Sequence, residues 1–302
     1  VPVVWAKSES FMPGGASNVA NNIHAVNASV HICGVVGDDE EGRILISELT
    51  KNGVNTDGII IDETRPTVNK TRIIAHHQQV VRIDKEDDGP IGPKVLNKIL
   101  DFIKRRISEV DAVIIEDYGK GLIVPSLIKN VIDIARRNKK IITVDPKEEH
   151  IRLYKNVTAI KPNRREAELV TGIKIKGKDS LKKAGNRLLD RLKTDAVLIT
   201  LGEDGMVLFQ SDGRMIHIPT VAQEVYDVSG AGDTAIALFT IAKASGANNI
   251  EAAHIANIAA GIVVEKLGIA VCSTQELRAH LGQLKEDFLN SKKEKYPSET
   301  IF

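Results

Sequence analysis

Short apolar runs alternate with longer stretches of helical periodicity along most of this chain. The apolar runs at 112–115, 141–144, 158–160 and 196–200 have the length of buried strands. The segments between them repeat their apolar residues at helical spacing. Strands that alternate with helices form right-handed βαβ units, so this order predicts a mostly parallel sheet covered by helices on both faces. We therefore expect an α/β protein with three layers, α/β/α.

The stretch 59–85 departs from this alternation. Residues 59–61, 67–75 and 80–83 have the composition of strands, and polar turns rather than helical patterns separate them. They predict a small antiparallel β insertion that stands apart from the main sheet. Near the other end of the chain, residues 206–209 and 215–218 predict a hairpin.

Charge and cysteine content exclude several classes of function. The chain has 302 residues, with 41 Lys and Arg against 40 Asp and Glu, so it carries no basic footprint for nucleic acid or for an anionic membrane. Two distant cysteines make no disulfide framework, and no apolar run approaches the ~18 residues of a membrane span. We expect a cytoplasmic protein with no nucleic-acid or membrane partner.

The strongest local motif is the segment Asp227-Val-Ser-Gly-Ala-Gly-Asp233. Gly230 and Gly232 let the backbone approach a ligand, and a helical pattern follows at once. The N–H groups of residues 230–233 can therefore face an anion at a helix N-terminus. Asp233 then lies where a carboxylate can take a proton from an attacking hydroxyl. An ordinary glycine turn with a helix-capping acid fits the spacing equally well.

Three further polar loops follow predicted strands. Asn163 and Glu166 share one helical face and could hold a hydrated Mg²⁺, or could simply cap the helix. The segment 200–205 could line phosphates or form a hairpin turn, and the segment 116–121 ends another strand. Ligands of open α/β sheets collect at the carboxyl ends of strands, so these loops together predict a ligand site there.

Together these residues resemble the ribokinase-like, PfkB-type carbohydrate kinases. The family's first signature matches Gly14-Gly15 with Asn18, and its second matches residues 227–233. Its intermediate motifs match Asn163 with Glu166, and Thr200 with Gly202 and Gly205. The resemblance spans nearly the whole chain, so residues 1–302 are expected to form one kinase domain in which about 59–85 contribute to a β lid. Within the family, residues 37–40, 66–72, 78–84 and 116–121 look most like D-glycero-D-manno-heptose 7-phosphate kinases, which act in ADP-heptose synthesis for lipopolysaccharide.

The resemblance implies an ATP- and Mg²⁺-dependent transfer to the anomeric hydroxyl of the sugar phosphate. It assigns general-base catalysis to Asp233 and stabilisation of the transferring group to the backbone of Gly230, Ala231 and Gly232. The residues that it implies for ATP are Asn163, Glu166, Thr200, Gly202, Gly205 and Gly268, with Glu166 also for the metal. The residues that it implies for the sugar are Gly14, Gly15, Asn18, Lys70, Arg72, Arg82 and Asp117.

Two other functions stay open: a kinase for a different sugar or sugar phosphate, and a nucleotide- or sugar-binding protein without turnover. The cations Lys70, Arg72 and Arg82 favour the heptose phosphate, because a substrate phosphate needs positive partners, although solvated strand residues would give the same pattern. The family's first strand is expected before residue 1. The H-x-G-H motif of the related nucleotidyltransferase domain does not occur in this sequence. A homodimer through the lid is also expected.

Overall fold

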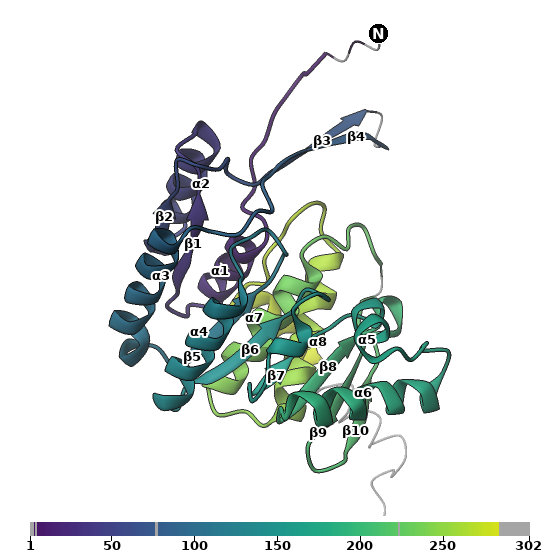
Figure 1. The fold of residues 1–302 in the computed structure, drawn as a ribbon. Coiled ribbons are helices and arrows are strands. Elements are labelled where there is room, and N and C mark those ends of the chain that lie inside the picture. The colour runs from purple at the N-terminus through teal and green to yellow at the C-terminus, as the bar shows by residue number, and fades with distance from the viewer. Residues whose placement is uncertain (1–2, 4, 76–77, 223, 284–302) are drawn as a thin grey trace, which may run out of the picture.

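The computed structural model of the protein describes residues 3, 5–75, 78–222 and 224–283 (Figure 1). Its largest sheet has six strands in the order β10-β9-β8-β7-β6-β5. Strands β5 to β8 are parallel, and β9 pairs antiparallel with both β8 and β10. The strands are β5 (Ala112–Glu116), β6 (Ile141–Asp145), β7 (Ala159–Ile160), β8 (Ala196–Thr200), β9 (Met206–Gln210) and β10 (Met215–Ile218). The predicted mostly parallel sheet and the predicted hairpin are both confirmed.

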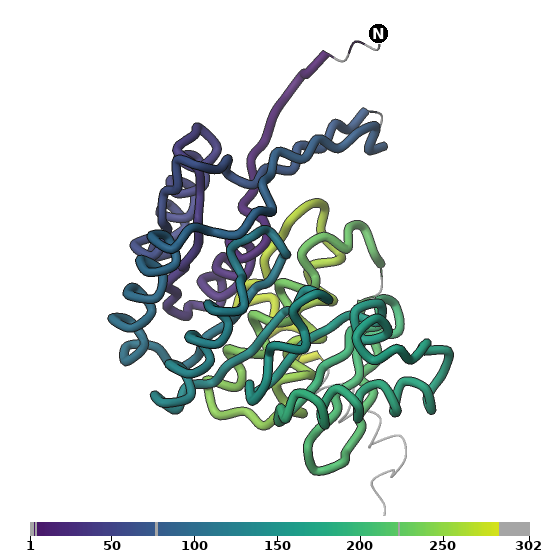
Figure 2. The backbone as a smooth tube through the Cα atoms, viewed as in Figure 1, coloured from purple at the N-terminus to yellow at the C-terminus, as the bar shows by residue number. Residues whose placement is uncertain are grey.

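Helices cover both faces of this sheet, which confirms the three-layer fold (Figures 1 and 2). One layer and its core contain α3 (Pro93–Arg106), α4 (Pro125–Arg137), α5 (Arg164–Thr171) and α6 (Lys178–Leu192). The other layer contains α1 (Ala16–Ala25), α7 (Ala231–Ala244) and α8 (Asn249–Val264). Pro93 and Pro125 begin their helices at the first turn, where a missing N–H costs nothing.

A second, two-stranded sheet contains β1 (His31–Val36) and β2 (Asn55–Ile61), with α2 (Glu40–Lys51) between them in the chain. Ile59 to Ile61 pair in parallel register with Gly34 to Val36. The prediction that residues 59–61 belong to the β insertion is therefore wrong. Half-buried Ile60 packs against the same core as α3 and α4. Burial of this side chain therefore places β2 beside β1, although the polar turn that follows β2 had suggested that it continues into the insertion.

The insertion itself is a ribbon of β3 (Asn69–Ala75) and β4 (Gln78–Lys85) that projects from the body of the molecule (Figures 1 and 2). Residues directly opposite in an antiparallel pair share one face of the ribbon. Thr71 faces Ile83 and Ile73 faces Val81, which makes one face largely apolar. The opposite face carries the cross-strand pairs Lys70 with Asp84 and Arg72 with Arg82. The ribbon therefore has an apolar face and a charged face.

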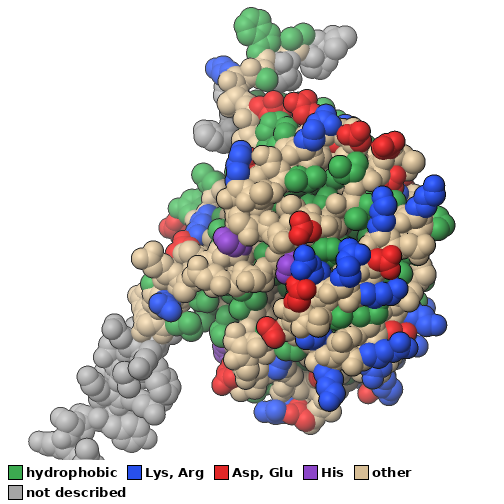
Figure 3. Space-filling model, turned by 90° about the vertical axis from the view of Figure 1, so that its left-hand side faces the viewer, with side chains coloured by type: hydrophobic (Ala, Val, Ile, Leu, Met, Phe, Trp, Pro, Cys, Tyr) green, Lys and Arg blue, Asp and Glu red, His purple; other side chains and the backbone are tan. Residues whose placement is uncertain are grey.

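The C-terminal helix predicted over 274–289 is helical through residue 283, and its remaining residues lie outside the described part of the chain, as do residues 291–302. On the side of the molecule in Figure 3, acidic and basic side chains are interspersed. Among the described residues, no helix is both long enough and apolar enough to cross a bilayer.

Candidate active site

The start of α7 has the backbone geometry of an anion site. Gly230 occupies the N-cap position at φ +82°, in the left-handed region that glycine adopts without strain. No side chain of the described residues caps this helix, whereas α5 and α8 both carry a capping box. The Ala231 N–H donates to the carbonyl of Val228 at 3.3 Å. The next two N–H groups of the first turn, those of Gly232 and Asp233, have no N-cap side chain as an acceptor, so they suit an anionic oxygen.

Asp233 is held by two side chains from distant parts of the sequence. Asn18 donates from Nδ2 to Asp233 Oδ2 at 2.8 Å, and the Tyr118 hydroxyl donates to Oδ1 at 2.6 Å. Asn18 is itself buried and accepts a hydrogen bond from Asn22. Burial raises the pKa of Asp233 above its usual value, although the two hydrogen bonds oppose the shift. The carboxylate is therefore fixed in position and more basic than an exposed one.

Glycines allow the backbone near Asp233 to lie close to Asn18 and Tyr118. A Cβ on Gly230 would lie 2.6 Å from Asn18 Nδ2, and a Cβ on Gly15 would lie 3.3 Å from the Tyr118 ring. Gly14 lies against Ile269, which also contacts the Gly230 position. The Gly268 N–H donates to the Asp227 carboxylate and helps to lower its pKa, after the larger effect of the Ser229 N–H. The first signature, the second signature and the 268–269 segment thus meet at one place.

Asp117 lies in a different environment from the one predicted for a sugar ligand. Its side chain is fully buried, and Oδ2 accepts from the Tyr154 hydroxyl at 2.7 Å and lies 2.8 Å from His150 Nδ1. Oδ1 accepts from the Gly119 N–H at 3.0 Å. These bonds fix the loop that follows β5. The residue of this loop that reaches Asp233 is Tyr118, which sequence reasoning did not single out.

Three largely buried charges next to Asp233 were also missed. Lys161 Nζ lies 2.8 Å from Asp145 Oδ2. Burial lowers the pKa of Lys161, but the charge and hydrogen bond of Asp145 outweigh this and raise the Lys161 pKa above its usual value. Burial, followed by the charges of Asp145 and Asp233, raises the pKa of Glu116 well above its usual range. A Cβ on Gly232 would lie 3.3 Å from Lys161 Nζ, so these charges lie directly against the glycine loop. Both acids end parallel strands, which is the signal that could have found them.

Apart from Gly268, which lies beside Asp227, the residues predicted for the nucleotide gather at the ends of β7 and β8. Asn163 and Glu166 form a complete capping box on α5, with bonds of 2.8 and 2.9 Å in the two directions. Thr200 makes a parallel bridge to Asn163. Gly202 and Gly205 have positive φ in the turn that follows, and a Cβ on Gly202 would meet no described atom within 4 Å. The capping interpretation of Asn163 thus holds in the structure, and it leaves Glu166 Oε1 available for another partner.

The lid cations differ in how they are paired. Lys70 Nζ lies 3.0 Å from Asp84 and 2.9 Å from Glu86, and Arg82 lies 2.8 Å from Asp84. Within the described part of the chain, Arg72 makes no ion pair at 4 Å or less. Its charge contributes to lowering the pKa of Asp227, behind the larger effect of the Ser229 N–H. The charged face of the ribbon is therefore within electrostatic reach of the glycine loop.

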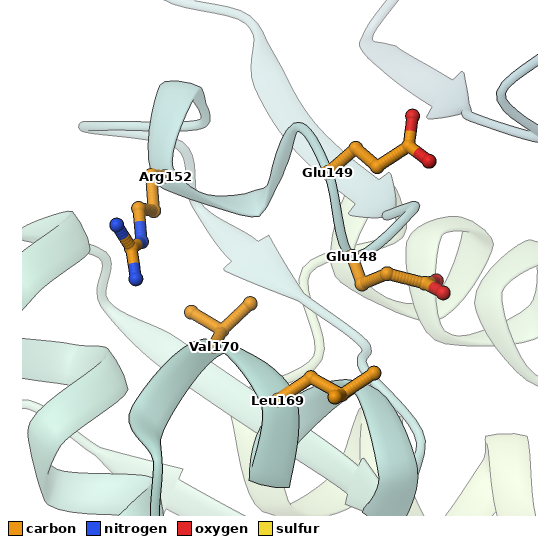
Figure 4. A pocket seen from close by; sticks show the side chains of 5 residues that line it. All are labelled: Glu148, Glu149, Arg152, Leu169 and Val170. Carbon is orange, nitrogen blue, oxygen red and sulfur yellow. The ribbon is translucent and has the colours of Figure 1, made fainter.

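A surface pocket of about 250 Å³ lies elsewhere, between the loop that follows β6 and helix α5 (Figure 4). Its lining residues are Glu148, Glu149, Arg152, Leu169 and Val170. None of the residues predicted for the site lines it, so the chemistry described above is not in this pocket.

Known proteins share both the sequence and the fold. Residues 2–276 match the model of the pfkB family carbohydrate kinases. Two curated relatives, each named bifunctional protein HldE, come from Helicobacter hepaticus (45% identical) and Geobacter metallireducens (43% identical). The aligned region covers 93% of this chain and 58% of each relative, so the chain spans little more than half of their length.

Solved structures at lower identity share the fold. Ribokinase of Arabidopsis thaliana, solved with ribose and ATP, superposes with a TM-score of 0.75 at 20% identity over 92% of this chain and 90% of its own. Phosphofructokinase-2 of Escherichia coli, solved with potassium, gives a TM-score of 0.77 at 18% identity over 94% of both chains. The family match over most of the sequence, with both glycine signatures meeting at one place, shows that this chain is a carbohydrate kinase and belongs to the pfkB family.

Proposed function

We propose that the chain transfers the γ-phosphoryl group of ATP to the anomeric hydroxyl of D-glycero-D-manno-heptose 7-phosphate. The product would be the 1,7-bisphosphate, an intermediate of cytoplasmic ADP-heptose synthesis for lipopolysaccharide. The observation that carries the reaction type is the half-buried Asp233 carboxylate beside the uncapped N-terminus of α7. A base and an anion site stand next to each other there, as phosphoryl transfer to a hydroxyl requires.

In this mechanism the anomeric oxygen attacks the γ-phosphorus as its proton passes to Asp233, and the bond to the ADP oxygen breaks. The Asn18 and Tyr118 hydrogen bonds keep both carboxylate oxygens in place before the substrate arrives. The N–H groups of Gly232 and Asp233 stabilise the charge that spreads over the transferring group. One such donor contributes about 10²–10³ in rate.

ATP would lie along the ends of β7 and β8, over Asn163, Thr200 and the Gly202–Gly205 turn. The Mg²⁺ that accompanies ATP would neutralise phosphate charge when it is bound. Glu166 suits it chemically, because a carboxylate oxygen is a ligand that Mg²⁺ prefers and Oε1 is not used by the capping box. Among the described residues Glu166 belongs to no group of three or more side chains at ligand spacing, so water and the nucleotide phosphates would complete the coordination of the ion.

The charged face of the ribbon supports a phosphorylated substrate. Among the described residues Arg72 has no carboxylate partner to displace, and its field already reaches Asp227. Lys70 and Arg82 are engaged with Asp84, so each would contribute less to a substrate phosphate than Arg72 does. A charge-assisted phosphate contact contributes about 1.5–3 kcal/mol.

The apolar face of the ribbon supports a homodimer. Ile83 is 55% exposed and Val81 is 43% exposed, although both belong to residue types that favour burial. A second copy brings the same apolar face, so two ribbons can cover each other. Val81→Glu together with Ile83→Glu should lower the molar mass measured by light scattering to that of one chain. A wild-type chain that is already monomeric at micromolar concentration would contradict the dimer.

A direct assay tests the substrate. ADP release should be measured with heptose 7-phosphate, unphosphorylated heptose, fructose 6-phosphate and ribose, and ³¹P NMR should identify the phosphorylated carbon. We expect kcat/KM for heptose 7-phosphate to exceed that for the unphosphorylated heptose by at least about tenfold, the value of one phosphate contact. Preference for another sugar would favour the first alternative, and no turnover with any of them would favour a binding protein.

A further inference from the structure

One carboxylate joins the ribbon to the loop that follows β5. Glu86 comes directly after β4, and its side chain is half-buried. Its Oε2 accepts from Lys70 Nζ on β3 at 2.9 Å, and its Oε1 accepts from Lys120 Nζ at 2.5 Å. The hydrogen bond from Lys120, followed by that from Lys70, holds the pKa of Glu86 below its usual value. Glu86 is therefore a charged link between the base of the ribbon and the loop that contains Lys120.

Backbone contacts lie beside this ion pair. The Ile91 N–H donates to the Gly121 carbonyl at 3.0 Å. Gly121 has a φ of +74°, and a Cβ there would lie 1.7 Å from the carbonyl oxygen of Gly89. The largely buried guanidinium of Arg65 donates to the carbonyls of Gly89 at 2.5 Å and of Lys120 at 3.3 Å. The segment that leads from the ribbon to α3 is thus packed tightly against the loop after β5.

The same loop reaches the Asp233 carboxylate at its other end. Tyr118 lies two residues before Lys120, and its hydroxyl donates to Asp233 Oδ1 at 2.6 Å. The Tyr118 side chain is 43% exposed, so its own packing does not suffice to fix the hydroxyl. The backbone on both sides of it has to do so. Buried Asp117 anchors the loop before Tyr118 through the Gly119 N–H, and Lys120 anchors it after Tyr118.

We propose that Glu86 and Lys120 are positioning residues for the phosphoryl transfer. Their ion pair fixes the loop that carries Tyr118, and Tyr118 in turn holds one oxygen of Asp233. Because Glu86 also binds Lys70, two ion pairs and one hydrogen bond join the ribbon to the carboxylate that accepts the proton. The inference rests on the proposed role of Asp233 as the base, but not on the identity of the sugar.

Lys120→Met tests the proposal, since it removes the ion pair and keeps an unbranched side chain. With whichever sugar the wild type phosphorylates, kcat should fall by about three- to tenfold and no further than in Tyr118→Phe, because the Asp233 carboxylate remains. KM for ATP should not change, because the nucleotide residues lie at the ends of β7 and β8. Lys120→Arg keeps the positive charge and should restore most of kcat. Lys104→Met is the matched control: it removes an exposed ion pair with Asp101 on α3 and should leave kcat unchanged.

Combination with Tyr118→Phe separates positioning from a general loss of stability. Once the Tyr118 hydroxyl is gone, Lys120→Met should lower kcat by less than about twofold, because two changes that act through one contact are not additive. A destabilised fold would lower kcat by the same factor in both backgrounds. Glu86→Gln gives the same test with a side chain of the same shape if Lys120→Met does not fold. Equal factors in the two backgrounds, or a wild-type kcat in Lys120→Met, would overturn the proposal.

Hydrogen exchange tells a failure of this inference from a failure of the proposed base. The Ile91 N–H, which is bonded to the Gly121 carbonyl, should exchange faster by at least about threefold in Lys120→Met and as in the wild type in Lys104→Met. If Asp233→Asn is inactive while Lys120→Met matches the wild type in exchange and kcat, only the positioning role is wrong. If Asp233→Asn keeps its activity, the proposed base is wrong, whatever the exchange shows of the ion pair.

Discussion

Replacing Asp233 with asparagine separates its proton-accepting role from its structural one. Each carboxylate oxygen accepts one hydrogen bond, from Asn18 at 2.8 Å and from Tyr118 at 2.6 Å. The amide oxygen of the variant can still accept from Asn18. Its NH₂ group can donate to the Tyr118 hydroxyl, which is able to reverse its role because a hydroxyl both donates and accepts. Two charge-assisted bonds become neutral ones, so stability should fall by no more than about 2 kcal/mol.

The rate should respond much more strongly than stability. An amide cannot take the proton of the attacking hydroxyl, and a positioned general base contributes about 10²–10⁴ in rate. At about 1.36 kcal/mol per factor of ten, this loss raises the activation barrier by about 2.7–5.4 kcal/mol. ATP affinity should stay within about threefold of the wild type, because Asn163, Thr200 and Gly202 lie at the ends of other strands.

Steady-state ADP release measures kcat, and calorimetric titration with ATP measures nucleotide affinity. Tyr118→Phe is the matched control, since it removes one hydrogen bond to Asp233 and leaves the carboxylate in place. It should lower kcat by about tenfold or less, because the carboxylate that accepts the proton remains and only its positioning is loosened. If Asp233→Asn keeps more than a tenth of kcat, or if Tyr118→Phe loses as much as Asp233→Asn, Asp233 is not the base.

Three further changes test other parts of the molecule. Gly230→Ala should cost about 1–3 kcal/mol of stability and much of kcat, because φ is +82° and the new Cβ would displace Asn18. Gly213→Ala is the control, since it has the same strain (φ +88°) and its Cβ would meet no described atom. Urea unfolding measures the stability of both variants, and an equal loss of kcat in the two would contradict the role of Asn18. Arg72→Ala should raise KM for the sugar phosphate by about 10- to 150-fold and leave KM for ATP unchanged, whereas a uniform rise would count against a phosphate contact. Burial raises the pKa of Asp39, but hydrogen bonds, those from Thr67 above all, outweigh it and lower that pKa to about 2. The carboxylate should therefore contribute about 1–2 kcal/mol to the free energy of unfolding. This contribution is fully present above pH ~4 and is lost as pH falls toward 2. Asp39→Asn should flatten the pH dependence of urea unfolding in that window, and parallel curves would refute this interpretation.

The sequence determined the order of the elements and the position of the glycine loop. Residues 227–233 predicted a helix start with an anion site because two glycines and an immediate helical pattern are local features. The start of α7 at Ala231 confirms the helix, and the anion site is still a prediction. The hairpin after β8 and the parallel strands were predicted for the same reason. The site roles of Gly14, Thr200 and Gly268 are still predictions, since their place in the structure fits a ligand site without identifying the ligand.

Only the tertiary structure decided which charges meet and which are already paired. Asp117 and Tyr118 are neighbours in sequence, yet the first is buried beneath its loop and the second reaches Asp233. Glu116 and Asp145 meet because β5 pairs with β6 in register, which no local pattern encodes. Lys70 is paired with Asp84 because β3 and β4 align these residues across the ribbon. Propensity and periodicity act over a few residues, whereas burial and charge pairing depend on groups that only the folded chain brings within a few ångströms of each other.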